Sequence, residues 1–184
     1  MKTRKTGTQN STYSAELSHK RDSISKTGFL EVPLRESIDM ILDYARSTGS
    51  VIQLHTGSGK SHVRLVEKLV RYAGKEVRFH LVHMGGNVDA HFYLIPRLLE
   101  WREEGLNIVC DTSWSGGFAL RWLLDLASEN PLLGSCIMFA SDEPWGIFQA
   151  ELAKVLDAAD GKPDLLEAVL WSNAARIYSR QSPT

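Results

Sequence analysis

The sequence lacks any uninterrupted apolar run of the length that a membrane-spanning helix requires, so we expect no membrane span. Its formal net charge of -1 provides no excess of basic residues, so nothing predicts nucleic acid or an anionic membrane as a partner. It has only two cysteines, Cys110 and Cys136, and no segment resembles a cleavable signal peptide. These absences predict a soluble protein in a reducing, cytoplasmic setting.

The composition otherwise fits one globular domain, with 43% hydrophobic and 23% charged residues. The character of the chain changes near residue 28. The preceding residues are rich in Lys, Arg, Ser and Thr and have few large apolar side chains with which to offset the entropy of ordering. We therefore predict a flexible tail over residues 1–28 and a folded domain over residues 29–184.

Helical and strand patterns alternate through the folded part. Amphipathic segments are predicted as helices over residues 33–49, 62–74, 92–105, 117–130, 147–160 and 165–178. Nearly continuous apolar runs between them are predicted as strands over residues 51–55, 77–83, 107–111 and 135–142. Strands that are apolar on both faces and separated by helices indicate a parallel sheet of the α/β class. Periodicity alone leaves open an open doubly wound sheet or an arc of a barrel.

Polar residues end these four predicted strands, namely His55, His83, Asp111 and Asp142. A short loop containing Gly, Ser or Pro follows each of them. Parallel α/β folds build their active sites at the carboxyl edge of the sheet, so four such residues at one edge predict a functional site. His80 stands three residues before His83 and is expected on the other side of its strand, in a structural role.

The segment TGSGKS, residues 56–61, is similar in sequence to a phosphate-binding loop. Such a loop needs glycine at the first position of G-x-x-x-x-G-K-[ST], where the chain turns out of a strand. Leu54 occupies that position here, which is a poor fit. A nucleotide-binding protein that uses this loop remains the alternative to a site at His55.

Five short segments are distributed over the predicted folded part: ILDYARSTGSVIQLHTG, FHLVHMGG, NIVCDTSW, MFASDEPW and LWSNAARIY. In this order and spacing they resemble the carboxyl-terminal half of the amidohydrolase-related family, which are metal-dependent hydrolases built on a TIM (β/α)8 barrel. The resemblance implies strands five to eight of that barrel. It also implies a hydrolase that acts on a carbonyl-type or carboxylate-bearing small molecule, with decarboxylation as a possible reaction because some members are decarboxylases.

The resemblance also implies roles for individual residues. His55, His83 and Asp142 would be metal ligands, with Asp142 and His83 also catalytic, and Zn²⁺ is the expected ion, with Mn²⁺ as the other candidate. Trp145, Ser113 and Trp114 are expected to contact substrate. Asp111 is expected either to support a neighbouring ligand or to cap the next helix. Arg176 is expected to anchor the last helix.

Compared with a complete barrel of eight βα units in about 250 residues, the sequence supplies four. The H-x-H pair that strand one ordinarily contributes is not found in the segment before Val32. We expect the site to be completed by a second copy of the chain or by a separate N-terminal half. A half-barrel without catalytic activity is the remaining possibility.

Overall fold

The structure is a computed structural model that describes residues 32–57 and 60–179. The chain divides into two compact units, Met1–Ile41 and Leu42–Thr184. Helix α2 (Val32–Thr48) begins in the first unit and ends in the second, where Leu42 and Ala45 are buried. The predicted tail, residues 1–28, lies outside the described residues. The boundary between tail and domain therefore stays a prediction.

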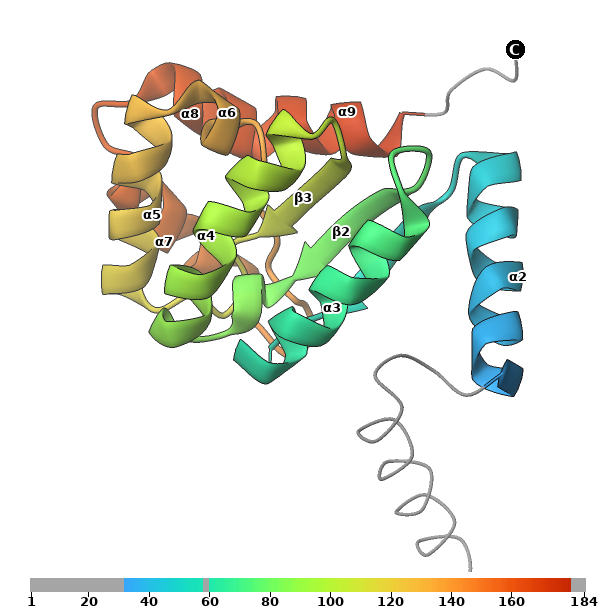
Figure 1. Cartoon of the computed structure of the whole chain (residues 1–184). Helices are drawn as coiled ribbons and strands as arrows, with labels where there is room; N and C mark the ends of the chain where they lie inside the picture. Colours follow the sequence, from blue (N-terminus) through green and yellow to red (C-terminus); the bar gives the residue numbers. More distant parts are fainter. Residues whose placement is uncertain (1–31, 58–59, 180–184) are drawn as a thin grey trace, which may run out of the picture. The chain divides into compact units, whose positions relative to one another are not determined.

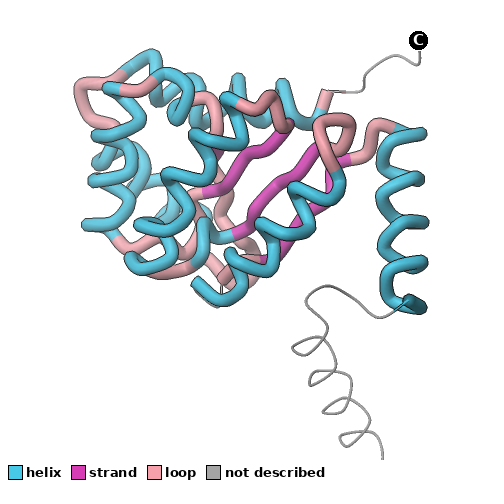
Figure 2. The backbone as a smooth tube through the Cα atoms, viewed as in Figure 1, coloured by secondary structure: helices cyan, strands magenta, loops and turns pink. Residues whose placement is uncertain are grey.

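The second unit is built on a parallel sheet of four strands, β1 (Val51–His55), β2 (Arg78–Val82), β3 (Asn107–Asp111) and β4 (Ile137–Met138). The strands lie in the order in which they follow in the sequence, and Figure 2 shows them side by side with helices in the connections. A doubly wound sheet reverses its strand order at a switch point, whereas a barrel keeps sequence order. The α/β class is confirmed, and the order is that of a barrel arc.

Helices connect and follow the strands (Figure 1). They are α3 (Lys60–Ala73), the 3-10 helix η1 (His83–Gly85), α4 (Val88–Glu103), α5 (Gly117–Glu129), α6 (Pro131–Gly134), α7 (Phe148–Ala158), α8 (Pro163–Glu167), the π-helix η2 (Ala168–Ser172) and α9 (Asn173–Tyr178). The six predicted helices are present. The last of them is divided by the π-helix, and the two short helices η1 and α6 were not predicted. Within the described ranges, no helix has both the length and the apolar character needed to cross a bilayer.

The two faces of the sheet differ in what covers them. Phe79 and Leu81 of β2 alternate with Arg78 and His80, and all four are buried. The apolar side faces the helices that connect the strands, of which α3 and α4 pack against one another. The opposite side meets α9, where Ile177 closes a small apolar cluster with strand residues of β3 and β4.

The closing segment is fastened to the sheet by polar contacts as well. Arg78 donates from Nη1 to the carbonyl oxygens of Ile177 (2.8 Å) and Ser179 (2.6 Å). Asn173 donates from Nδ2 to the carbonyl oxygens of Gly134 and Ile137, at 2.8 and 2.7 Å. Arg176 donates to the carbonyl oxygen of Ser135, in keeping with its predicted role as an anchor. The Asn and Arg of the NAAR sequence thus bind the start of β4.

The fourth strand is shorter than predicted. The sequence predicts strand through Asp142, but β4 ends at Met138. The backbone N–H of Phe139 donates to the carbonyl oxygen of Val169 in η2 and not to the sheet. Asp142 therefore lies in a loop, in a left-handed conformation with φ of 55°.

Candidate active site

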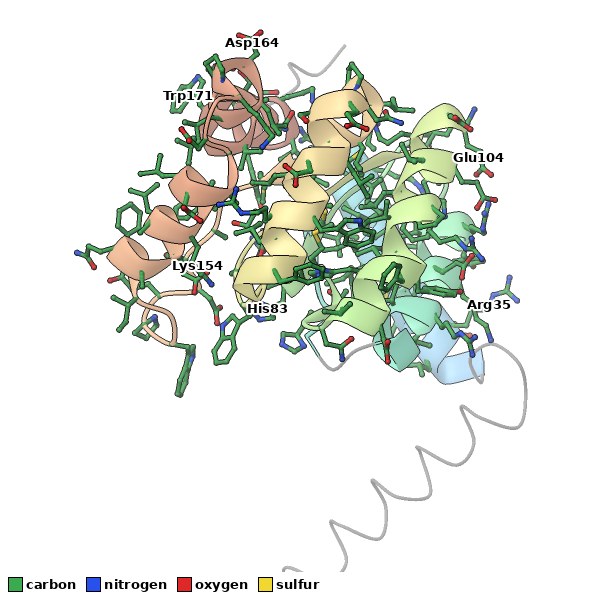
Figure 3. All side chains as sticks on the ribbon, turned by 90° about the vertical axis from the view of Figure 1, so that its left-hand side faces the viewer. Arg35, His83, Glu104, Lys154, Asp164 and Trp171 are labelled. Atoms are coloured by element: carbon green, nitrogen blue, oxygen red, sulfur yellow. The ribbon has the colours of Figure 1, made fainter. Side chains whose placement is uncertain are left out.

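A cavity of about 480 Å³ lies at the carboxyl edge of the sheet. Its lining residues come from the last residue of β1 and from the segments that follow the four strands: His55, Gly57, His83, Gly86, Trp114, Asp142 and Trp145. Figure 3 shows His83 at the end of this unit opposite to Asp164 and Trp171. Five of the residues predicted from the sequence, the two histidines, the aspartate and the two tryptophans, are thus brought together.

The two histidines of the cavity are in contact. Their ring centroids lie 4.9 Å apart, and the ring planes meet at 85°. His55 is the exposed last residue of β1, whereas the side chain of His83 is 9% exposed. Two imidazoles that meet edge to face at a cavity wall can direct nitrogen lone pairs into the same space.

Asp142 approaches the same space from the loop after β4. Its Oδ2 lies 4.0 Å from Nε2 of His83 and accepts a hydrogen bond of 2.6 Å from the indole N–H of Trp114. The backbone carbonyl of Asp142 accepts from the N–H groups of Trp145 and Gly146, both at 2.8 Å. The carboxylate is therefore fixed by a neighbouring indole and by a tight turn.

Three of the cavity residues, and one neighbour, hold a left-handed backbone conformation that side chains rarely adopt. The φ angles are 71° at His83, 51° at Met84, 61° at Trp114 and 55° at Asp142. Such conformations cost of order 1–3 kcal/mol each and cluster at functional sites. Their concentration around one cavity supports a functional role for it.

Two glycines, neither of them predicted as a site residue, make the close approach of the loops possible. A Cβ on Gly57 would stand 2.9 Å from Cδ2 of His83 and 3.1 Å from Nε2 of His55. A Cβ on Gly86, where φ is 73°, would stand 2.5 Å from the carbonyl oxygen of Gly57. The signal in the sequence is a glycine soon after each strand-end histidine, in HTG and HMGG.

Gly57→Ala is expected to destabilise the protein by about 1–3 kcal/mol, because the added methyl group must displace both imidazoles. Gly116→Ala is the matched control, since a Cβ there meets no heavy atom within 4 Å. We expect that variant to stay within about 0.5 kcal/mol of the parent. Urea unfolding measures both, and equal effects of the two substitutions would contradict the close packing of the histidines around Gly57.

Behind the cavity, Asp111 is buried and binds several partners. Its Oδ1 accepts from the backbone N–H of His83 (3.1 Å) and of Ser113 (3.0 Å), and also from the hydroxyl of Ser113. Its Oδ2 lies 2.7 Å from Nε2 of His80. The N-cap of α5 is Gly116, so Asp111 supports its neighbours and does not cap that helix.

Ser113 lies behind the cavity as well. It was expected to contact substrate, but it is fully buried and does not line the cavity. Its hydroxyl bonds Asp111 on one side and lies 2.8 Å from Nδ1 of His83 on the other. The physical reason is the neighbouring buried carboxylate, which turns the hydroxyl inward.

The TGSGKS segment begins directly after His55, the last residue of β1. Leu54, at the position where a phosphate-binding loop needs its first glycine, still pairs with Leu81 inside the sheet. The hydroxyl of Thr56 is buried and bonds the carbonyl of Val82 at 2.6 Å and the N–H of Gly85 at 2.8 Å. Residues 58–59 lie outside the described part. The turn that a phosphate-binding loop makes at its first position is therefore not formed at Leu54.

The cavity is lined by two imidazoles and one carboxylate. Imidazole nitrogen and carboxylate oxygen suit Zn²⁺ and Mn²⁺, and the space left by the missing Cβ of Gly57 borders both imidazoles. Among residues 32–57 and 60–179, no three His, Cys, Asp or Glu side chains are close enough to hold an ion by themselves. The donor set thus fits a metal ion in its chemistry, but the described residues do not form a complete metal site.

The fold and this site define an α/β protein of barrel type whose functional residues gather at the carboxyl edge of a parallel sheet. The model of the amidohydrolase family matches residues 20–180, so the chain belongs to the amidohydrolase family. The matched range begins inside the predicted tail. The comparison with curated proteins gave no significant match.

Solved structures with partial similarity include two decarboxylases. 5-Carboxyvanillate decarboxylase from Sphingomonas paucimobilis is 22% identical with a TM-score of 0.40, over 58% of this chain and 35% of that chain. 2,6-Dihydroxybenzoate decarboxylase from Rhizobium is 19% identical with a TM-score of 0.44, over 64% of this chain and 39% of that chain. The structure of that enzyme in complex with 2,6-dihydroxybenzoate is 19% identical with a TM-score of 0.45, over 64% of this chain and 39% of that chain. The chain thus matches less than half the length of these proteins.

Proposed function

We propose that the chain carries the catalytic residues of a metal-dependent enzyme of the amidohydrolase family, which acts on a carbonyl-type or carboxylate-bearing small molecule. The observation that carries this proposal is the cavity in which His55, His83 and Asp142 meet at the carboxyl edge of the sheet. A site of this kind is where parallel α/β folds place their chemistry. An activity assay distinguishes hydrolysis from decarboxylation.

In this proposal His55, His83 and Asp142 hold the cation, most readily Zn²⁺, with Mn²⁺ as the alternative. A bound cation of this kind supplies a water whose pKa is lowered toward neutrality. Asp142 is placed to accept a proton in the cavity, because its carboxylate lines the cavity and Oδ2 is held by the Trp114 indole. Trp114 and the exposed Trp145 flank the cavity and are proposed to contact the substrate.

A structural or catalytic zinc takes three or four protein ligands, so we propose that the remaining donors come from outside this set. The candidate sources are a second copy of the chain and a separate N-terminal half. The buried free thiols of Cys110 and Cys136 agree with the proposed reducing, cytoplasmic setting. Burial raises the pKa of the Cys136 thiol to about 11, which keeps it protonated at neutral pH.

Elemental analysis of the purified chain tests the proposal. We expect bound zinc or manganese in the parent and its loss in both His55→Ala and Asp142→Ala, because each substitution removes a proposed ligand. Asp164→Ala is the control, because Asp164 is an exposed carboxylate at the opposite end of this unit (Figure 3). Equal metal content in all four proteins would contradict the site.

A further inference from the structure

A line of hydrogen bonds, buried from His80 onward, connects the closing helix to the cavity. It runs through Gln53, Tyr178, His80, Asp111, Ser113 and His83. Two of its members are histidines, each of which can carry its proton on either ring nitrogen. The other members restrict that choice, because a carboxylate only accepts and a hydroxyl has a single hydrogen to donate.

The branch that reaches the cavity starts at Oδ1 of Asp111. Ser113 donates its only hydroxyl hydrogen to this oxygen, and Asp111 cannot donate in return. The oxygen of Ser113 must then accept from Nδ1 of His83, 2.8 Å away. His83 therefore carries its proton on Nδ1, and the lone pair of Nε2 faces Asp142 across 4.0 Å.

The other branch starts at Oδ2 of Asp111 and gives a consistent assignment. His80 donates from Nε2 across 2.7 Å, which leaves its Nδ1 to accept from the hydroxyl of Tyr178, also at 2.7 Å. The oxygen of Tyr178 in turn accepts from Nε2 of Gln53 at 2.8 Å. Each hydrogen donated along this line thus has one acceptor, and both carboxylate oxygens of Asp111 accept hydrogen bonds.

From this arrangement we propose that Asp111 and Ser113 are positioning residues that hold His83 as the Nδ1–H tautomer, with Nε2 free toward the cavity. Asp111, Ser113 and His80 are all less than 7% exposed, so water competes little for these bonds. The proposal rests on the proposed function in one respect. It assigns Nε2 of His83 as the atom that would bind the cation or accept a transferred proton.

The tautomer can be read by nitrogen-15 NMR of the metal-free, uniformly labelled chain, well above the ordinary histidine pKa of about 6.5. A ring nitrogen without a proton resonates far downfield of one that carries it. The His83 signals are identified by their loss in His83→Gln. We expect a single Nδ1–H tautomer in the parent, its loss in Ser113→Ala, and its return in Ser113→Thr, which restores the hydroxyl.

Ser128→Ala is the matched control, since the hydroxyl of Ser128 is exposed and, among the described residues, bonds its own helix at the carbonyl of Asp125. It should leave the His83 signals unchanged. A proton on Nε2 of His83 in the parent, or an unchanged tautomer in a folded Ser113→Ala, would overturn the proposal. If Ser113→Ala does not fold, the parent spectrum alone decides. Because the protein is metal-free, failure here is distinguishable from failure of the metal site.

Discussion

Trp101→Ala is expected to lower the free energy of unfolding by about 4 kcal/mol, the typical loss for a large aromatic side chain removed from a core. Trp101 lies in the last turn of α4 and is fully buried. Its truncation leaves a cavity that the packed helices around it can only partly close. For a domain of this size the loss corresponds to a fall of roughly 10 °C in Tm.

Trp171→Ala is the control for this substitution, because Trp171 is 70% exposed and lies at the surface of η2. We expect a change within about 0.5 kcal/mol. Trp101→Phe tests a finer point, since the indole N–H of Trp101 has no hydrogen-bond partner in the described part of the chain. Phenylalanine removes that unpaired N–H and keeps most of the ring, so its cost should be well below that of alanine. Urea unfolding that ranks Trp171→Ala with Trp101→Ala would contradict the described core.

Stability is also expected to fall by about 3 kcal/mol between neutral pH and pH 4 through His91 alone. This side chain is fully buried in α4, and neither ring nitrogen has a partner among the described residues. Burial lowers the pKa of His91 from 6.5 to about 4. Between these two values the unfolded chain binds a proton that the folded chain does not, so the contribution is complete above pH 6.5 and lost as pH falls toward 4.

The corresponding experiment compares unfolding free energies of the parent and His91→Leu across this pH range. Leucine fills a similar volume and cannot be protonated. The unfolding free energy of the variant should therefore change with pH less steeply than that of the parent, by about 1.2 kcal/mol per pH unit near pH 5. It should also avoid the cost of two unpaired ring nitrogens. Parallel pH profiles for the two proteins would show that His91 is not the group responsible.

Much of the fold could be predicted, because buried parallel strands and amphipathic helices have distinct local patterns. Strands β1, β2 and β3 follow the predicted runs closely, and Gly49, Gly74 and Gly105 take the left-handed conformation expected where helices end. The end of β4 could not be predicted. It depends on the N–H of Phe139 meeting Val169, a contact between residues 30 positions apart that leaves no trace in the local pattern.

The location of the site could be predicted from the sequence more readily than the arrangement of its side chains. Strand ends meet at one edge of a parallel sheet, so His55, His83 and Asp142 were expected together and line one cavity. The inward turn of Ser113 could not be foreseen, because it follows from the burial of Asp111. His80 was expected to be structural, and it does bond Asp111 and Tyr178, but its connection to the cavity only becomes visible in three dimensions.

The attachment of the closing segment has a consequence for how the protein is made. Arg78 and Ile177 are 99 positions apart in the sequence, and His80 and Tyr178 are 98 apart. A chain that leaves the ribosome from its N-terminus has therefore exposed β2 long before the partners of that strand exist. The line of hydrogen bonds from Tyr178 to the cavity is complete only when the last helix of the nascent polypeptide arrives.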